Sequence, residues 1–186
     1  MGDYFINLIA PELDADGAEK AKAATDDYLI GNALVLPEKK DCVLGGDGFP
    51  PGPRFQELFS WPVQSLGLLT NGVQVAATKD IKFVDAGQGD YHFYCPSCRV
   101  ESFAYGDERY TPWQEAMDSF FDGGSGLLAC PHCDRATRVD QWLYVPHSGF
   151  SRFRVTFWNS PSLRKERVRE LSELIGCPLQ IVQGKR

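Results

Sequence analysis

The sequence predicts an α+β fold, in which helices pack against a sheet and a cysteine-containing segment is inserted midway along the chain. Two observations support this class. Short stretches rich in β-branched and aromatic residues alternate with stretches whose apolar residues repeat every three or four positions. In addition, two CPxC sequences lie between a strand–helix–strand pattern in the first part of the chain and a second such pattern at its end.

The first two expected elements are a strand and a helix. Residues 4–10 (YFINLIA) form a strand, which Pro11 ends. Asp16 can then cap a helix over residues 17–29, because its carboxylate can accept from the free N–H groups of the first turn. Apolar side chains in this stretch recur at helical spacing, so one side of the helix should face the core.

The next stretch predicts a loop followed by strands. Residues 45–53 are almost entirely glycine and proline, which is typical of a loop, and no GK[ST] follows that would make it a phosphate-binding loop. After a turn at Asn71-Gly72, residues 73–77 and 81–84 should form two short strands. Residues 64–70 fit either a strand across that turn or the end of a helix.

Four cysteines in the middle of the chain share one local pattern. Two residues between cysteines let both sulfur atoms of a tight turn face one point, and proline after the first cysteine fixes φ for the turn. Two such turns complete a tetrahedral set of thiolates, which suits zinc. The chain is neither short nor secretory in character, so disulfides are not favoured. The sequence therefore predicts a structural Zn²⁺ ion held by Cys95, Cys98, Cys130 and Cys133.

Other uses of these cysteines explain less. Four reduced core thiols, or one redox CxxC pair, would leave two matching turns unexplained. A hydrolytic zinc ion needs an open position for water, and four thiolates close the coordination shell. Arg99 and Arg135 follow the two turns and can offset the thiolate charge, while His132, inside a turn whose ligands are already assigned, should lie at the surface.

A helix should lie between the two CPxC turns. Thr111, Pro112 and Gln114 fit the N-cap, N1 and capping-box positions. Gly123-Gly124 fits the C-terminal end. Apolar residues at i, i+3, i+4, i+7 and i+8 form its core-facing stripe, namely Trp113, Ala116, Met117, Phe120 and Phe121.

The last part of the chain repeats the strand–helix–strand order. Residues 153–157 alternate apolar and polar side chains, as a half-buried strand does. Ser160-Pro161 should open a helix that Gly176 ends, and Leu179, Ile181 and Val182 suggest a closing strand. The apolar stripe of this helix is Leu163, Val168, Leu171, Leu174 and Ile175. Cys42 and Cys177 are expected to be small apolar core residues.

Together these elements give a helix-on-sheet sandwich, for which a ferredoxin-like arrangement is one candidate. Residues 1–89 would form the N-terminal half of the α+β domain. Residues 90–146 would form an inserted zinc ribbon that carries one helix. Residues 147–186 would complete the α+β domain with a strand, a helix and a strand.

Composition excludes several classes of protein. The 43% hydrophobic and 24% charged residues are ordinary for a folded domain, which excludes wholesale disorder. No apolar run approaches the roughly 20 residues that span a bilayer, and the first residues carry no basic leader. We therefore expect a cytoplasmic protein with no membrane association.

Charge is unevenly distributed along the chain. Residues 1–89 hold 13 acidic and 7 basic side chains, and residues 90–150 hold 9 and 4, whereas residues 151–186 hold 3 and 8. Nucleic acid is therefore not expected to bind the ribbon, since phosphate binding needs clustered cations. The ribbon aromatics that could stack on bases alternate as a half-buried strand would: Tyr91, Phe93, Tyr94 and Phe103.

From about Asp80 to Ile181 the chain resembles a group of small, uncharacterised bacterial zinc-ribbon proteins. Besides the two CPxC turns, the resemblance includes the sequences IKFVDAG (81–87), WQEAMD (113–118), GFSRF (149–153) and IGCPL (175–179). It implies metal ligation by the four named cysteines and implies no reaction. The first 79 residues match the group poorly.

No catalytic constellation is recognisable around the three histidines, His92, His132 and His147, so we do not expect an enzyme. The leading hypothesis is a zinc-stabilised acidic protein-binding module, most simply a bacterial immunity or antitoxin protein that neutralises a basic toxin. The alternative is a regulatory or nucleic-acid-associated zinc-ribbon protein that uses the basic C-terminal segment.

Overall fold

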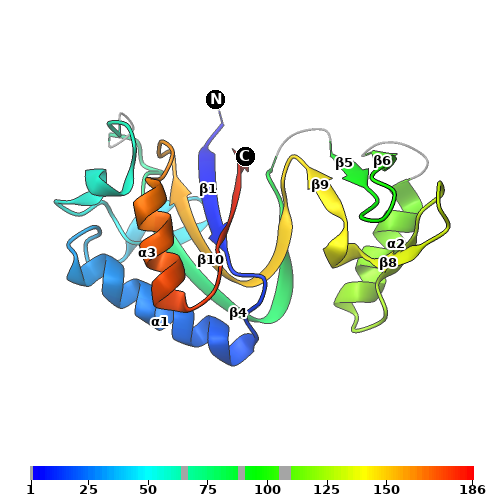
Figure 1. Ribbon diagram of the computed structural model, residues 1–186. Helices are drawn as coiled ribbons and strands as arrows, with labels where there is room; N and C mark the ends of the chain where they lie inside the picture. Colours follow the sequence, from blue (N-terminus) through cyan, green and yellow to red (C-terminus); the bar gives the residue numbers. More distant parts are fainter. Residues whose placement is uncertain (1, 64–66, 88–90, 105–109) are drawn as a thin grey trace. The chain divides into compact units, whose positions relative to one another are not determined.

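The computed structural model describes residues 2–63, 67–87, 91–104 and 110–186 (Figure 1). The predicted α+β class is confirmed, because the described residues form helices together with several antiparallel sheets. The chain divides into two compact units. The first unit comprises residues 1–87 and 150–186, and the second unit comprises residues 88–149.

The first unit is built on a four-stranded sheet with the strand order β11-β1-β10-β4. Strand β1 pairs antiparallel with both β10 and β11. Helix α1 (Ala15–Gly31) connects β1 to the part of the chain that leads to β4, and helix α3 (Lys165–Ile175) connects β10 to β11. The strands are β1 (Tyr4–Ile9), β4 (Val73–Val84), β10 (Gly149–Trp158) and β11 (Gln180–Lys185).

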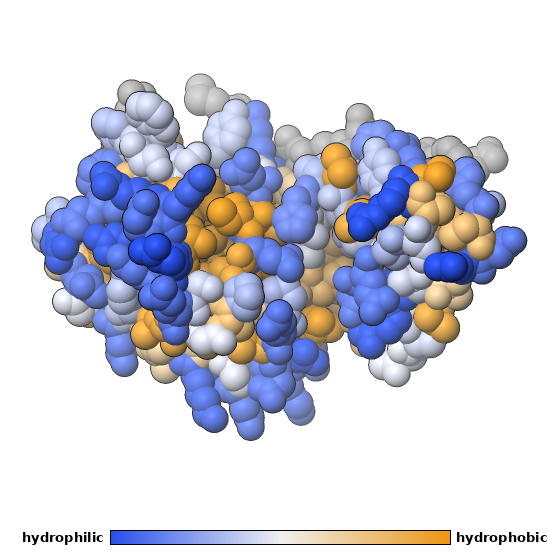
Figure 2. Space-filling view, viewed as in Figure 1, coloured by the Kyte–Doolittle hydropathy of each residue, from blue (hydrophilic) through white to orange (hydrophobic). Residues whose placement is uncertain are grey.

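Both helices contribute to one core on one face of this sheet. Side chains alternate along a strand, so Ile6 and Leu8 of β1 point to the same face as Phe153, Val155 and Phe157 of β10. All five are buried in one cluster with Leu29 of α1 and Leu171 of α3. Figure 1 shows the two helices side by side, and Figure 2 shows hydrophilic side chains over their outer faces. Full burial of one such side chain contributes about 1.5–3 kcal/mol.

The second unit has an aromatic core. Strands β6 (Glu101–Ala104), β5 (His92–Tyr94) and β9 (Leu143–Val145) form one sheet, and β7 (Leu127–Ala129) pairs with β8 (Ala136–Arg138). Helix α2 (Tyr110–Phe121) places Trp113 against Phe93, with ring centroids 4.8 Å apart. Tyr144 packs edge-on against Phe93 at 5.5 Å. The predicted half-buried alternation agrees with this packing, because Phe93 and Phe103 are both buried.

Two expectations for the first half of the chain are wrong in detail, and a third, for residues 64–70, is tested only in part. Asp14, and not Asp16, caps α1, since its carboxylate accepts from the Gly17 N–H at 2.7 Å. Residues 73–77 and 81–84 are not two strands, because β4 runs without a break from Val73 to Val84. Of residues 64–70, the first three lie outside the described residues, and the rest form turns and bends.

The glycine-rich stretch is also more ordered than its composition suggests. A hairpin of β2 (Lys40–Val43) and β3 (Gly46–Gly48) includes the start of the predicted loop. Gly45 has φ of +79°, a left-handed conformation that suits glycine in the tight turn. Phe49 then pairs with Val73, which joins the hairpin to the start of β4. A short 3₁₀ helix, η1 (Phe55–Leu58), follows.

The predicted starts of two helices are wrong, whereas both predicted ends are confirmed. Tyr110 already belongs to α2, so Thr111 is not its N-cap and Gln114 makes no capping box. Helix α3 begins at Lys165 and not at Ser160-Pro161, because Leu163 pairs with Phe59 in a β-bridge. Gly123 and Gly176, both with φ of +81°, follow the two helices.

Within each predicted apolar stripe one residue faces solvent. Phe121 of α2 is 44% exposed and Leu174 of α3 is 43% exposed. Trp113, Ala116 and Met117 are buried as expected. Helix α2 also contacts β7 and a short 3₁₀ helix, η2 (Val139–Gln141).

Candidate metal centre and exposed apolar hollow

The two CPxC turns bring four sulfur atoms together in the second unit. The Sγ atoms of Cys95, Cys98, Cys130 and Cys133 all lie within 4.8 Å of one another. Cys95 Sγ lies 3.8 Å from Cys133 Sγ, and Cys98 Sγ lies 3.7 Å from Cys130 Sγ. These distances are far longer than the roughly 2.05 Å of an S–S bond, and all six cysteines are free. The cluster can therefore hold a metal ion.

Both turns have the same backbone geometry. In the first, the Arg99 N–H donates to Cys95 O at 2.9 Å and the Cys95 N–H donates to Val100 O. In the second, the Asp134 N–H donates to Cys130 O at 2.9 Å and the Cys130 N–H donates to Arg135 O. Two copies of one local structure thus face each other, as the repeated spacing predicts.

Hydrogen-bond donors surround the sulfur atoms. The Ser97 N–H donates to Cys95 Sγ at 3.3 Å, and the His132 N–H donates to Cys130 Sγ at 3.4 Å. Ser102 Oγ is buried 3.4 Å from Cys130 Sγ and 3.1 Å from Val100 O, and its one hydroxyl hydrogen can be donated to either atom. Such donors favour the thiolate, which is the form that binds a metal.

The pKa values of Cys130 and Cys133 shift in opposite directions when no cation offsets the thiolate charge. Burial opposes ionisation of Cys130, yet the hydrogen bonds from Ser102 and from backbone N–H groups outweigh it and lower the pKa of Cys130 to about 6. At Cys133 the Arg135 backbone favours the thiolate, but desolvation and the neighbouring sulfur atoms raise the pKa to about 11. One thiolate therefore discourages the next, and a cation would be needed for all four to ionise.

No histidine ring belongs to the ligand set formed by the four cysteines among the described residues. His132 is exposed, as expected, and its Nε2 lies 3.1 Å from Glu101 O. His92 Nδ1 lies 3.0 Å from Glu101 Oε1, and Tyr94 donates to the other carboxylate oxygen at 3.1 Å. His147 is exposed on the loop before β10.

Cys42 and Cys177 lie in the first unit, away from the cluster. Cys42 is buried with Phe5 and Trp158, and its Sγ lies 3.3 Å from Gly48 O. Burial raises its pKa, so it stays a neutral thiol. Cys177 is half-buried against the main core. Both behave as the small apolar residues that the sequence predicts.

Ser102 was missed by the sequence analysis. It lies on β6, outside both CPxC turns, and reaches Cys130 across the cluster. Its only sequence signal is a small polar residue that interrupts a strand between the turns. Such a signal is too common to identify a sulfur contact.

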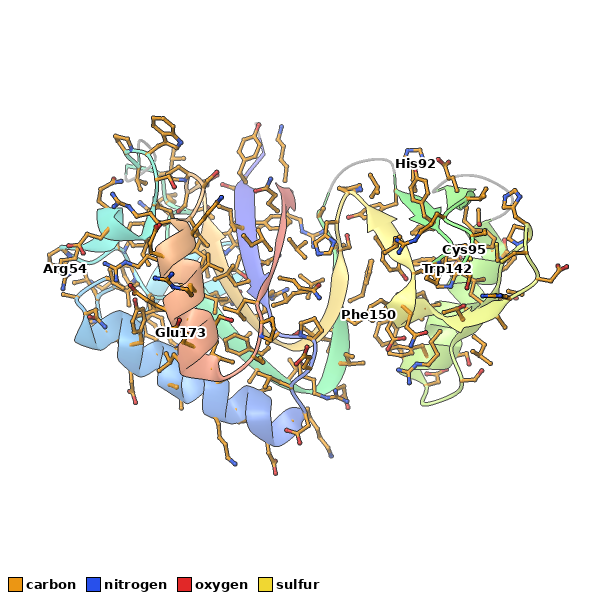
Figure 3. All side chains as sticks on the ribbon, viewed as in Figure 1. Arg54, His92, Cys95, Trp142, Phe150 and Glu173 are labelled. Carbon is orange, nitrogen blue, oxygen red and sulfur yellow. The ribbon has the colours of Figure 1, made fainter. Side chains whose placement is uncertain are left out.

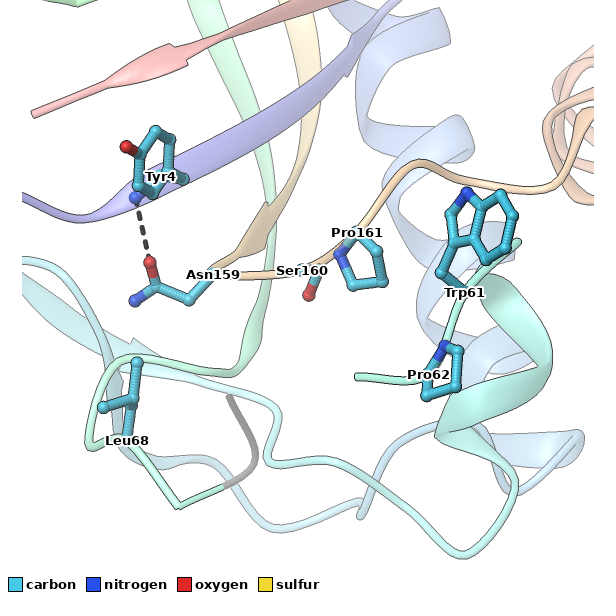
Figure 4. Close-up of a pocket in the computed structure, with 7 residues that line it drawn as sticks. All are labelled: Tyr4, Trp61, Pro62, Leu68, Asn159, Ser160 and Pro161. Atoms are coloured by element: carbon cyan, nitrogen blue, oxygen red, sulfur yellow. Dashed lines mark hydrogen bonds between the residues drawn. The ribbon is translucent and has the colours of Figure 1, made fainter. Parts of the chain in front are cut away.

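A second feature is an exposed hollow in the first unit, with a volume of about 460 Å³ (Figure 4). Its lining is mainly aromatic, aliphatic and proline side chains, together with Asn159 and Ser160. The Tyr4 N–H donates to Asn159 Oδ1 at 2.9 Å and joins two sides of it. Trp61 is 69% exposed, Tyr4 59% and Leu68 54%. The other apolar lining residues are Pro62 and Pro161.

Comparisons of the chain with protein-family models, with curated proteins and with solved structures gave no significant match. Among the described residues, no helix has both the length and the apolar character needed to cross a bilayer.

Proposed function

We propose that the protein is a non-enzymatic protein-binding module, stabilised by a structural Zn²⁺ ion, whose partner is a basic protein. The observation that carries the proposal is the exposed hollow around Tyr4, Trp61 and Leu68. Large apolar side chains grouped on a surface mark interaction sites, and tryptophan and tyrosine dominate the binding energy of such sites.

Zinc suits the sulfur cluster. A tetrahedral Zn–S bond of about 2.3 Å implies S–S edges of about 3.8 Å. The pairs at 3.8 and 3.7 Å agree with that edge length. Four thiolates complete the coordination shell, so the metal would hold the two turns together and leave no position for a reacting water. Reduced cysteines also support a reducing compartment such as the cytoplasm.

We also infer the finer fold assignments. The first unit has the chain order β1-α1-β4-β10-α3-β11 and the sheet order β11-β1-β10-β4. This order supports a ferredoxin-like arrangement. The paired CPxC turns support a zinc ribbon for the second unit and are compatible with membership of the bacterial group named above.

Charge favours a basic partner. Residues 1–150 hold 22 acidic and 11 basic side chains. The β2–β3 hairpin exposes Asp41 and Asp47, and the Asn71 and Gly72 N–H groups donate to Cys42 O of this hairpin, next to the loop that carries Leu68. The acidic charge of residues 1–150 would steer a cationic protein, whose apolar side chains the hollow would then bury. A toxin neutralised by an immunity protein is one such partner.

The alternative, nucleic-acid binding through the basic C-terminal segment, has less support. Arg164 donates to Phe59 O at 2.7 Å, and Arg167 is paired with Glu57 and Glu170. These cations serve internal contacts, and counterion release requires cations that reach phosphates.

A capture experiment with matched variants tests the proposal. Leu68 and Leu127 are 54% and 53% exposed, so Leu68→Ala and Leu127→Ala remove the same side chain inside and outside the hollow. The wild-type protein should retain a basic protein from lysate of its own host, identified by mass spectrometry. Trp61→Ala should weaken that complex by about 2 kcal/mol, roughly thirtyfold in Kd, and Leu68→Ala should weaken it as well.

Leu127→Ala should bind like the wild-type protein. If the retained protein is acidic, or if both leucine variants bind equally well, the hollow is not the binding surface. A gel-shift assay at low salt covers the alternative, in which a shift with nucleic acid and no protein partner would replace the proposal.

A further inference from the structure

We propose that the first unit binds a small molecule carrying a carboxylate or phosphate group, in a cavity on the sheet face opposite the helices. The cavity has a volume of about 190 Å³. At about 30 Å³ for each water molecule, this is room for roughly six waters or a small organic anion. It is separate from the sulfur cluster and from the hollow proposed for protein binding.

Strand register explains why polar side chains meet here. Phe5 pairs with Trp158 and Asn7 pairs with Thr156 across β1 and β10, and Ile9 pairs with Arg154. Directly paired residues lie on the same face of a sheet, so Arg154, Thr156 and Trp158 all point away from the helix-covered core. Gln74 of β4 and Arg186 complete the polar lining.

Two buried donors in this lining have no acceptor among the described residues. They are Nε of Arg154 and Nε1 of Trp158, a side chain that is only 7% exposed. A buried N–H without an acceptor costs free energy, because it has lost its water and gained nothing in exchange. An acceptor bound at the cavity wall would remove this cost at both groups once the side chains beside them shift to admit it, because neither atom is accessible from the cavity in this structure.

The side-chain amide nitrogen of Asn7 is a third donor in this lining. Thr156 Oγ1 donates to Asn7 Oδ1 at 2.7 Å in a buried contact. That bond occupies the amide oxygen of Asn7 and leaves its Nδ2 group to donate at the cavity wall. The lining thus offers donors from a guanidinium, an indole and an amide, a set that suits an oxygen-rich anion.

Charge at the cavity is positive overall. Arg154 and Arg186 both line it, and the only carboxylate described as paired with either is Asp85, whose Oδ1 lies 2.9 Å from Arg186 Nη2. Desolvation and the neighbouring Arg186 charge both lower the pKa of Arg154. Arg186 also lies over the Phe5 ring, 5.7 Å from its centroid, which holds this guanidinium in position.

Size selects a small ligand. A groove that tracks a nucleic-acid backbone must be long and open, whereas this cavity has a volume of only about 190 Å³. Paired guanidinium groups bind carboxylates and phosphates through parallel hydrogen bonds. The ligand class is therefore a small carboxylate or phosphate compound.

Indole N–H resonances provide a direct test with the full-length protein. The chain has four tryptophans, so a ¹H–¹⁵N spectrum resolves four indole signals, and Trp158→Phe assigns one of them. Titration with inorganic phosphate and, separately, with succinate should shift the Trp158 signal in a saturable manner. The signals of Trp61, Trp113 and Trp142 should stay in place, and potassium chloride at equal ionic strength should have no effect.

Arg154→Met is compared with Arg169→Gln, which removes an exposed arginine elsewhere in the first unit. Arg169 lies on α3, is 71% exposed and pairs only with Glu173 among the described residues. Arg154→Met should lower the affinity for phosphate or succinate at least tenfold, and Arg169→Gln should leave it unchanged. Without added anion, Arg154→Met should melt at the same temperature as the wild-type protein or higher, because it removes a half-buried guanidinium whose Nε has no acceptor among the described residues.

The response to the two anions identifies the preferred group, since either one alone or both support the site. The proposal is overturned if neither anion moves the Trp158 signal, or if all four indole signals move together. Equal loss of affinity in Arg154→Met and Arg169→Gln would show nonspecific charge binding and would also overturn it.

Discussion

Arg99 and Asp134 adopt the same left-handed backbone conformation, with φ of 62° and 57°, and each directly follows the second cysteine of its CPxC turn. Side chains other than glycine rarely occupy this region, because Cβ approaches the neighbouring carbonyl oxygen. The two residues are held there by the backbone hydrogen bonds that close each turn on its first cysteine. The turns therefore carry matching local strain.

Substitution at Arg99 should reveal this strain. We expect Arg99→Gly to keep the stability of the second unit and Arg99→Val to be less stable than Arg99→Gly by about 1–2 kcal/mol, since valine is least suited to positive φ. Thermal unfolding of the two variants measures the difference. At Asp118, an exposed position within α2, the order should reverse, because valine is tolerated better than glycine in a helix by a few tenths of a kcal/mol. The same order at both positions would refute the strain argument.

Metal removal should unfold the second unit selectively. Elemental analysis should find one zinc ion per chain, and a chelator or Cys130→Ser should remove it. Trp113 and Trp142 are buried in the second unit, so their fluorescence should shift to the red as that core opens. Helices α1 and α3 should keep their far-ultraviolet signal.

Cys42→Ser is the control for this experiment, since Cys42 belongs to the first unit. It should keep the full metal content. Unchanged fluorescence after complete loss of the metal would rule out a structural role for the ion.

An ion-pair network across α1, α3 and η1 should make stability depend on pH. Tyr28 donates to Glu170 Oε2 at 2.6 Å, and Arg167 donates to the same oxygen at 2.8 Å. The hydrogen bond from Tyr28, followed by that from Arg167, lowers the pKa of Glu170. The ionised carboxylate thus stabilises the fold above the ordinary carboxyl pKa, and this contribution is lost as the pH falls through the lowered value.

Arg167→Met should therefore cost about 1 kcal/mol at neutral pH, because Glu57 and Glu170 are 42% and 40% exposed and solvent screens their charge, and it should cost less in acid, where Glu170 is protonated. Urea unfolding at several pH values measures both quantities. Arg169→Met should change stability by under about 0.5 kcal/mol, because Arg169 and Glu173 are 71% exposed and 3.7 Å apart. A pH-independent loss in Arg167→Met would mean that Arg167 acts by packing and not by charge.

Gly184 should tolerate no side chain. A Cβ atom there would lie 1.5 Å from Ala86 O, whose carbonyl accepts from the Lys185 N–H at 3.1 Å. Gly184→Ala must move the segment with Ala86 away from β11, and we expect a loss of at least about 2 kcal/mol. Gly31→Ala is the control, since a Cβ there meets nothing within 4 Å, and it should be neutral or stabilising in a thermal melt.

Local patterns predicted the features that depend on few neighbouring residues. The two CPxC turns were identified because each places its ligands within four positions. Gly123 and Gly176 ended their helices as expected, because positive φ is a property of one residue. The predicted cap of the first helix was wrong, because Asp14 and Asp16 are both plausible caps and only the folded chain selects between them.

Features built from distant residues could not be predicted. Ser160-Pro161 looks like a helix start, but Ser162 O accepts from the Ser60 N–H, about one hundred positions away, and the chain stays extended. The glycine-rich hairpin depends on the pairing of Phe49 with Val73. Asn7 of β1 and Arg154 of β10 line the same cavity because of the pairing register of the two strands. No periodicity in the sequence predicts that register.

The first and last strands lie next to each other (Figures 1 and 3), with Tyr4 paired with Lys185. The Arg186 N–H donates to Asp3 O at 2.9 Å. A short glycine linker could join these two segments without disturbing β1 or β11. The polypeptide could then be opened at Gly123-Gly124, directly after α2, to give a circular permutant. Both CPxC turns would be kept, each near a different new terminus, so zinc would bring the two free ends of the rearranged chain together.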